Sequence, residues 1–152
     1  MNQHTPSPPT DSWWWFGELA KHRVRAEQTN DAMSIVEILA PPGLSVPPHV
    51  HHREDEAFVI LDGGGTFHVG DRTVEAKPGD VLFGPRGVVH DYTVGPKGCR
   101  MLFIFTPGRN MESFIAESGV RAAADTLPPA EIGPPEAEQL AGILQRHGLA
   151  FA

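Results

Sequence analysis

The sequence predicts an all-β fold, a sandwich or small barrel, followed by two short helices. Glycine and proline contribute 16 and 15 of the 152 residues, which favours many turns between short elements. Between residues 47 and 107, short apolar segments alternate with turn sequences, a spacing typical of antiparallel strands. After Pro107 the apolar spacing becomes helical, which places the helices at the C-terminal end.

The expected strands are short and lie between Gly- and Pro-rich turns. The first, residues 32–39, is rich in β-branched and apolar residues and ends at a Pro-Pro-Gly sequence. Six further apolar segments follow, at residues 57–61, 66–69, 73–76, 80–83, 88–94 and 100–105. We expect turns at residues 62–65 and 95–98, where glycines cluster. Because no helical pattern interrupts these segments, a parallel sheet with crossover helices is not expected.

Two amphipathic helices are expected after the strands. Met111, Phe114 and Ile115 recur at helical spacing, with Gly119 as a stop. The same spacing recurs in a second set that ends at a glycine: Leu140, Ile143, Leu144, His147 and then Gly148. Both helices should pack against the outside of the β unit.

Length and composition predict one domain. We expect it to span residues 12–152, with a barrel core at about 31–106 and a helical segment at about 109–148. Residues 1–11 are polar and rich in proline, which predicts a flexible tail. An aromatic cluster at residues 13–16 follows, and we expect it to pack in the core or against a second copy, or to cover a substrate.

The charge and hydropathy patterns exclude several classes of partner. The formal net charge is −7, and no basic stripe is present to neutralise phosphates, so no nucleic-acid or membrane-surface partner is expected. No apolar run reaches the length of a transmembrane helix. The first ten residues do not have the pattern of a signal peptide, so a cytoplasmic location is expected.

The histidine pattern indicates a metal site. His49 and His51 are two residues apart, so on a strand both side chains point to the same face. A short turn leads to Glu56, which a hairpin would return beside them, although Glu54 and Asp55 are close rivals. His90 begins another expected strand. Three imidazoles and a carboxylate suit one divalent transition metal ion, whether Fe, Ni, Mn, Co, Cu or Zn.

These residues lie in two motifs that resemble those of the cupin superfamily. The first motif fits at every position: Gly43-x5-His49-x-His51-x4-Glu56-x6-Gly63. The second begins 15 residues later and reads Gly79-x5-Pro85-x-Gly87-x2-His90. Its last position, usually Asn in the family, is Val94 here. The resemblance covers residues 31–105.

The resemblance implies an antiparallel jelly-roll barrel with a metal ion near one mouth. His49, His51, Glu56 and His90 would be the metal ligands. Three residues in phase with these ligands are expected to line the cavity and contact a small-molecule substrate: Phe58, Ile60 and Tyr92. This expectation assumes that side chains alternate regularly between the two faces of each strand, without a bulge.

Within the superfamily, residues 49–58 are most similar to small single-barrel proteins described as similar to quercetin 2,3-dioxygenases. This resemblance implies a metal-dependent dioxygenase acting on a flavonol-like or other enolisable or phenolic molecule, with Glu56 as general base. Two alternatives use the same site. One is an isomerase, cyclase or lyase that needs no dioxygen, and the other is a non-enzymatic, metal-dependent binding module. The family resemblance also implies a homodimer, with residues 13–16 as the candidate contact.

Overall fold

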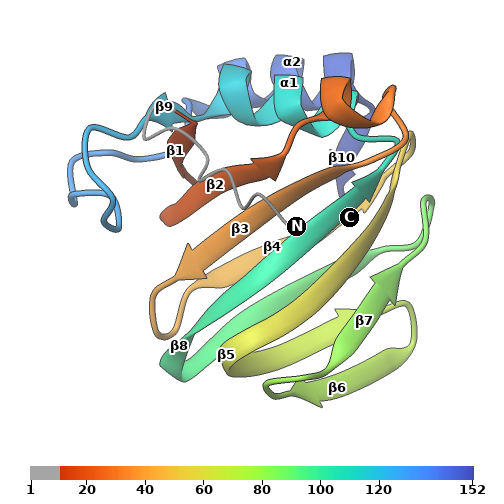
Figure 1. Ribbon diagram of the computed structural model, residues 1–152, viewed down its shortest axis with the longest axis vertical. Helices are drawn as coiled ribbons and strands as arrows, with labels where there is room; N and C mark the ends of the chain where they lie inside the picture. Colours follow the sequence, from red (N-terminus) through yellow and green to blue (C-terminus); the bar gives the residue numbers. More distant parts are fainter. Residues whose placement is uncertain (1–10) are drawn as a thin grey trace, which may run out of the picture.

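The computed structural model describes residues 11–152 and confirms the all-β jelly-roll class with two short helices (Figure 1). In chain order the elements are β1 (Ser12–Trp15), β2 (Glu18–Val24), the 3-10 helix η1 (Ala26–Thr29), β3 (Ser34–Ala40), β4 (Ser45–His51), β5 (Asp55–Val69), β6 (Arg72–Ala76), β7 (Val81–Gly84), β8 (His90–Thr106), α1 (Arg109–Ser118), β9 (Val120–Arg121), α2 (Ala137–His147) and β10 (Leu149–Phe151). The ten strands of the described residues form one curled antiparallel sheet that does not close.

Strand β8 is the centre of this sheet. Along one edge its first part pairs with β4 and its later part with β3. Along its other edge it pairs with β5 over nearly its whole length. The far edge of β5 pairs with β7 near its start and with β6 near its end. Every strand that carries a proposed metal ligand is therefore either β8 itself or a direct neighbour of β8.

The expected turns at residues 62–65 and 95–98 are wrong, because β5 and β8 run through both segments. Their pairing shifts register there, from Gly63 with Cys99 to Gly65 with Val94, so residues 95–98 have no partner on β5. A Cβ atom on Gly63 would collide with the carbonyl oxygen of Gly98, and one on Gly65 would collide with that of Thr93. These glycines mark bulges within continuous, bent strands, where two backbones approach closely (Figure 1).

A hairpin that we did not predict carries the aromatic cluster into the fold. Phe16 and Gly17 connect β1 to β2, and both have positive φ angles, 52° and 86°, as two-residue hairpin turns require. Trp15 is buried, and its indole N–H donates to the Ser118 hydroxyl at 2.9 Å. The cluster thus packs within this chain, as one of the alternatives expected, while the homodimer stays a prediction.

The two predicted helices are confirmed, and both end at glycines. Gly119 follows α1, and Gly148 follows α2 with a left-handed φ of 68°. The helices lie together across the upper end of the sheet in Figure 1, above β1 and β2. Met111 and Phe114 of α1 are buried in the core. The helices therefore cover one end of the sheet and complete the wall of the cavity described below.

The beginning of the expected tail, residues 1–10, lies outside the described residues. Asp11 is described: its carboxylate accepts from Arg25 at 2.9 Å, and its carbonyl accepts from the His22 N–H at 3.0 Å. The single-domain organisation of residues 12–152 stays a prediction. Among the described residues, neither helix has the length and apolar character needed to cross a bilayer.

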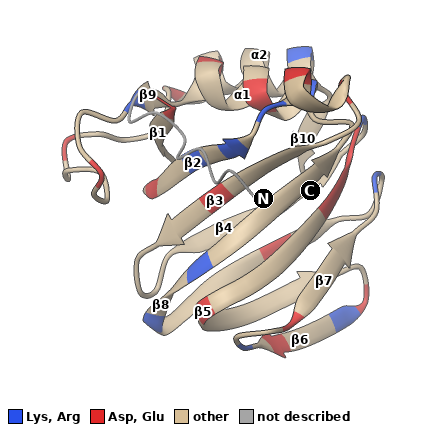
Figure 2. Ribbon diagram, viewed as in Figure 1, with Lys and Arg blue, Asp and Glu red and all other residues tan. Residues whose placement is uncertain are grey.

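Charged residues are mixed over the surface. Figure 2 shows Lys and Arg on separate strands, loops and helices. Several of them are paired with carboxylates, including Arg23 with Glu37 at 2.7 Å and Arg86 with Asp55 at 3.1 Å. Exposed pairs of this kind contribute little stability. The fold therefore depends on its core and sheet.

His22 is a buried titratable group outside the metal cluster. It lies on β2, is 1% exposed, and its Nδ1 has no hydrogen-bond partner among the described residues. Burial, reinforced by the charge of Arg25 and partly opposed by Asp11, lowers its pKa from 6.5 to about 4. The folded protein therefore holds His22 neutral in a range where the unfolded chain protonates it.

We expect His22→Gln to reduce the acid sensitivity of folding. Between pH 6.5 and 4 the unfolded state binds more protons than the folded state, so wild-type stability falls as the pH falls. The His22 contribution to that fall is at most about 3 kcal/mol. Urea unfolding across this range measures it, with the exposed His52→Gln as the matched control. Equal pH slopes for wild type and His22→Gln would contradict the prediction.

Candidate metal centre

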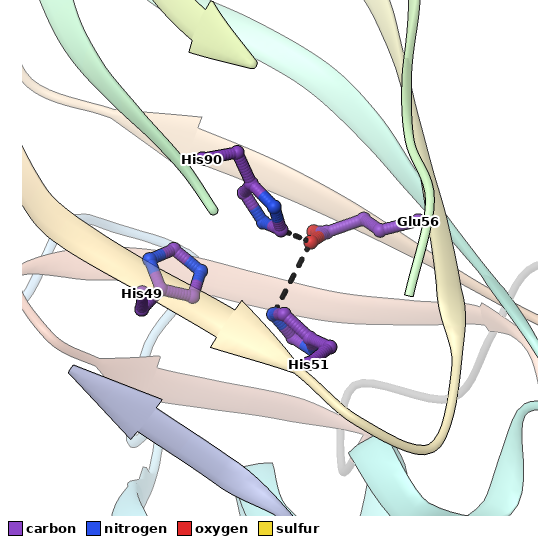
Figure 3. A group of neighbouring side chains, drawn as sticks. All are labelled: His49, His51, Glu56 and His90. Carbon is purple, nitrogen blue, oxygen red and sulfur yellow. Dashed lines mark hydrogen bonds and ion pairs between the residues drawn. The ribbon is translucent and has the colours of Figure 1, made fainter. Parts of the chain in front are cut away.

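Three histidines meet because of strand pairing. His49 and His51 lie two residues apart on β4, and His49 is directly opposite His90 of β8. The ring centroids of His49 and His90 are 4.4 Å apart, and those of His51 and His90 are 5.2 Å apart. With Glu56 of β5, each residue offers one donor atom, and these four atoms lie within 4.8 Å of one another (Figure 3).

Glu56 reaches this cluster by a different route from the expected hairpin. Within the described residues β4 pairs with β8 and β10, whereas β5 pairs with β6, β7 and β8. Glu56 is paired with Gly84 of β7 and Phe105 of β8. The hairpin expectation is wrong, because the curl of the sheet brings Glu56 towards the histidines from another strand (Figure 3).

Two glycines before β8, one at the end of β7 and one in the following loop, position His90. A Cβ atom on Gly84 would lie 3.2 Å from Nδ1 of His90, closer than an ordinary contact. Gly87 has a φ of 79° and donates its backbone N–H to the carbonyl oxygen of His51 at 2.7 Å. The loop is therefore tied to the strand that carries the other two histidines.

The hydrogen bonds of the three imidazoles leave one nitrogen of each ring available. Each Nδ1 faces an oxygen outside the cluster: His49 faces Pro47 O at 2.8 Å, His51 faces Glu54 Oε1 at 3.0 Å, and His90 faces Val88 O at 3.3 Å. Carbonyl and carboxylate oxygens accept, so these contacts place the ring proton on Nδ1. The Nε2 atoms are then the ones turned towards the cluster, and that of His90 lies 3.0 Å from Oε2 of Glu56, a contact that a bound cation would replace.

Electrostatics keep the cluster in a form suited to a cation. Burial opposes the charge of Glu56, yet the hydrogen bond from His90 and the nearby imidazoles hold its pKa below the usual value. Burial and the neighbouring His90 lower the pKa of His49 to about 4. Burial also disfavours the charge of His90, but its contact with Glu56, 3.0 Å from Nε2 to Oε2, raises the pKa of His90. His90 and Glu56 thus share a proton, which a bound cation would displace.

The donor set fits a divalent transition metal ion. Three imidazole nitrogens and one carboxylate oxygen converge, and this part of the chain contributes no thiolate. An ion that accepts five or six ligands would keep one or two positions open, as catalytic sites do. The cluster can hold a metal ion, and the individual ligand roles stay our proposal.

The structure separates the rival acids. Glu54 is fully buried and lies outside the cluster, where its carboxylate accepts from His51 and from the side-chain amide of Asn110 at 3.0 Å. Asn110 lies on α1 and also donates to the carbonyl oxygen of His147 at 2.7 Å. Asp55 instead pairs with Arg86. Glu54 therefore orients His51 and connects the cluster to the helices.

The cluster opens on a cavity of about 330 Å³. His49, His51 and Glu56 form part of its wall. Most of the rest is apolar, and it includes these aromatic residues: Trp15, Phe16, Phe58, Tyr92, Phe103 and Phe114. Such a wall suits a flat, mainly apolar molecule.

The structure distinguishes among the three expected substrate contacts. Phe58 and Tyr92 line the cavity, as their phase predicts. Ile60 is buried in the core and is not among the lining residues. Ile60 keeps the buried phase of Glu56 and Phe58, but it lies further along β5, where the side chains pack in the hydrophobic core.

Sequence reasoning missed Glu18, which also lines the cavity. It is the first residue of β2 and is fully buried. The Tyr92 hydroxyl donates to its Oε1 at 2.5 Å. The one available signal was an acid directly after the Phe-Gly turn, between two apolar stretches.

Comparison with known proteins identifies the family. Residues 35–105 match the family model described as "Cupin domain". An uncharacterized protein of Aquifex aeolicus is 30% identical over 96 residues, which cover 59% of this chain and 79% of the relative. The chain belongs to the cupin superfamily.

A sequence and a solved structure from Thermotoga maritima are also similar. An "oxalate-binding protein" is 37% identical over 73 residues, which cover 48% of this chain. The match spans 60% of that relative's length. The crystal structure of a "predicted oxalate decarboxylase" superposes with a TM-score of 0.53 at 29% identity, over 59% of this chain and 80% of that one.

Replacing His49 or His90 by alanine should lower metal content sharply. Each substitution removes one of four converging donors, and we expect affinity to fall at least about 10-fold. Elemental analysis after dialysis measures metal content, and circular dichroism checks that the sheet remains folded. The exposed His52→Ala should keep the wild-type content. A full equivalent of metal in the double variant His49→Ala/His90→Ala would show that the ligand assignment is wrong.

Removing the Glu54 carboxylate should weaken metal binding without removing a donor. Glu54→Leu leaves the Nδ1 proton of His51 without its acceptor, and affinity should fall about 10- to 100-fold. Glu54→Gln keeps an acceptor oxygen, so its loss should be smaller. Competition with a chromophoric chelator measures both. Wild-type affinity in both variants would argue against an orienting role for Glu54.

Proposed function

We propose that this protein is a metal-dependent dioxygenase that acts on a flavonol-like or other enolisable or phenolic small molecule. One observation carries the proposal: a cluster of three imidazoles and one carboxylate opens directly on an aromatic cavity. The cluster suits an oxygen-bearing end of the substrate, and the aromatic wall suits its apolar body.

The residues of the cavity have separate tasks in this proposal. His49, His51, His90 and Glu56 would hold the ion, which supplies Lewis acidity and a common binding point for oxygen ligands. Glu56 stays ionised and is positioned to accept the proton of an enol or phenol. The rings of Phe58 and Tyr92 border the cavity and pack against a flat substrate.

The cavity argues against oxalate as the ligand, although both Thermotoga names refer to oxalate. No Lys or Arg is among the described residues that line it, whereas Glu18 and Glu56 are. Oxalate is a small dianion, so it would fill only a small part of the 330 Å³ cavity and would leave most of the apolar wall without contacts. A larger and less charged molecule fits this wall better.

A second reaction class is favoured by a specific observation. Burial raises the pKa of Glu18 to about 8, against the hydrogen bond from Tyr92, so the cavity contains a neutral carboxylic acid as well as the ionised Glu56. Two carboxyl groups held in opposite protonation states are typical of proton-transfer enzymes. An isomerase, cyclase or lyase that needs no dioxygen is therefore the alternative.

Oxygen uptake distinguishes these functions. Protein loaded separately with Fe, Mn, Co, Ni, Cu or Zn is mixed with a panel of flavonols and 1,3-diketones, in air and under nitrogen. A dioxygenase consumes dioxygen with substrate and releases carbon monoxide from quercetin, and His49→Ala removes this activity because the ion is lost. Turnover under nitrogen would favour the isomerase class. Tight binding without turnover in either condition would favour a binding module.

A further inference from the structure

Glu18 and Tyr92 form a second polar position in the wall of the cavity. Glu18 follows the Phe16-Gly17 turn, and both it and Tyr92 are buried and line the cavity. Neither residue belongs to the cluster of proposed metal ligands. The cavity therefore contains a polar pair in addition to the metal centre.

One oxygen of this pair has no partner. Oε1 of Glu18 accepts from Tyr92, whereas Oε2 has no hydrogen-bond partner among the described residues. A buried polar atom without a partner costs free energy, so native proteins nearly always satisfy such atoms. A ligand in the cavity that Glu18 lines can supply the missing hydrogen bond.

The surroundings favour a neutral carboxyl group. The described residues of the cavity wall include no Lys or Arg to compensate a charge. Burial and the charge of Glu56 raise the pKa of Glu18 to about 8. The Tyr92 hydroxyl donates to Oε1, so the proton of Glu18 belongs on Oε2, where it can be donated to a ligand.

We propose that Glu18, oriented by Tyr92, is a specificity-determining residue that hydrogen-bonds through Oε2 to a hydroxyl or carbonyl oxygen of the ligand at a position separate from its metal-binding end. The cavity then selects molecules with an apolar body and two separate oxygen functions. The choice of ligand class rests on the proposed function, but the hydrogen bond itself does not require any reaction.

A purely structural role does not account for this arrangement. A leucine at position 18 would fill the apolar site without leaving an oxygen unsatisfied. A buried carboxyl oxygen without a partner among the described residues, on a side chain that lines a cavity, indicates a functional site.

Phenol and toluene provide a matched pair of probes, because they differ by a hydroxyl in place of a methyl group. Their affinities are measured by calorimetry on protein loaded with Zn²⁺, which has no redox chemistry. We expect Glu18→Leu to lower the preference for phenol over toluene about 3- to 10-fold relative to wild type, the size of one hydrogen bond. Glu18→Gln keeps a donor and should retain most of the preference, and Tyr92→Phe should reduce it.

Infrared spectroscopy tests the same hydrogen bond independently of affinity. The carbonyl band of a protonated carboxylic acid should be present in wild type at pH 6 and absent in Glu18→Gln. Phenol should shift this band and toluene should not. Glu138→Leu, at an exposed position of α2, is the control for loss of an acid and should match wild type in both experiments.

The outcomes separate this proposal from the proposed reaction. An unchanged phenol preference in Glu18→Leu, a carbonyl band that phenol does not shift, or no binding of phenol to wild type would each overturn the role of Glu18. Absence of oxygen uptake with every substrate would overturn the dioxygenase and leave these binding results intact.

Discussion

The pairing of β8 with β4 on one edge and with β5 on the other is the constraint on which the site depends. It sets His90 opposite His49 and brings Glu56 from a strand that does not pair with β4. A one-residue slip in either pairing would turn a ligand to the other face of the sheet. The glycines at the bulges of β5 preserve this register, because a side chain at Gly63 or Gly65 would collide with the backbone of β8.

The buried polar groups follow from this geometry. Placing four ionisable side chains close together in the interior requires hydrogen-bond partners for the polar atoms that point away from the cluster. The chain supplies backbone carbonyls for His49 and His90 and the carboxylate of Glu54 for His51. The inner nitrogens then converge, and a cation is the natural partner for three lone pairs and a carboxylate. Asn110 extends this network to both helices, so the covering elements and the metal centre are held together.

The same covering elements shape the cavity. The β1–β2 hairpin contributes Trp15, Phe16 and Glu18, and α1 contributes Phe114. These lie outside residues 35–105, the part that matches the family model. The metal cluster is therefore built by the shared β core, whereas much of the surface that would contact a substrate comes from segments on either side of it. We therefore expect substrate specificity to depend on those flanking segments.

Residue spacing and the two family motifs were enough to predict that the four proposed ligands come together, and spacing alone was enough to predict both helices, because two-residue alternation, turn sequences and glycine stops are local properties. It was not enough to predict the route by which Glu56 reaches the cluster, the burial of Ile60 in the core, the separate positions of Glu54 and Asp55, or the presence of Glu18 in the cavity. Those features depend on which distant strands pair and where the sheet curls. Short-range residue patterns do not predict such contacts. Only the tertiary structure decided them, since burial and close backbone approach arise when segments far apart in the sequence occupy the same space.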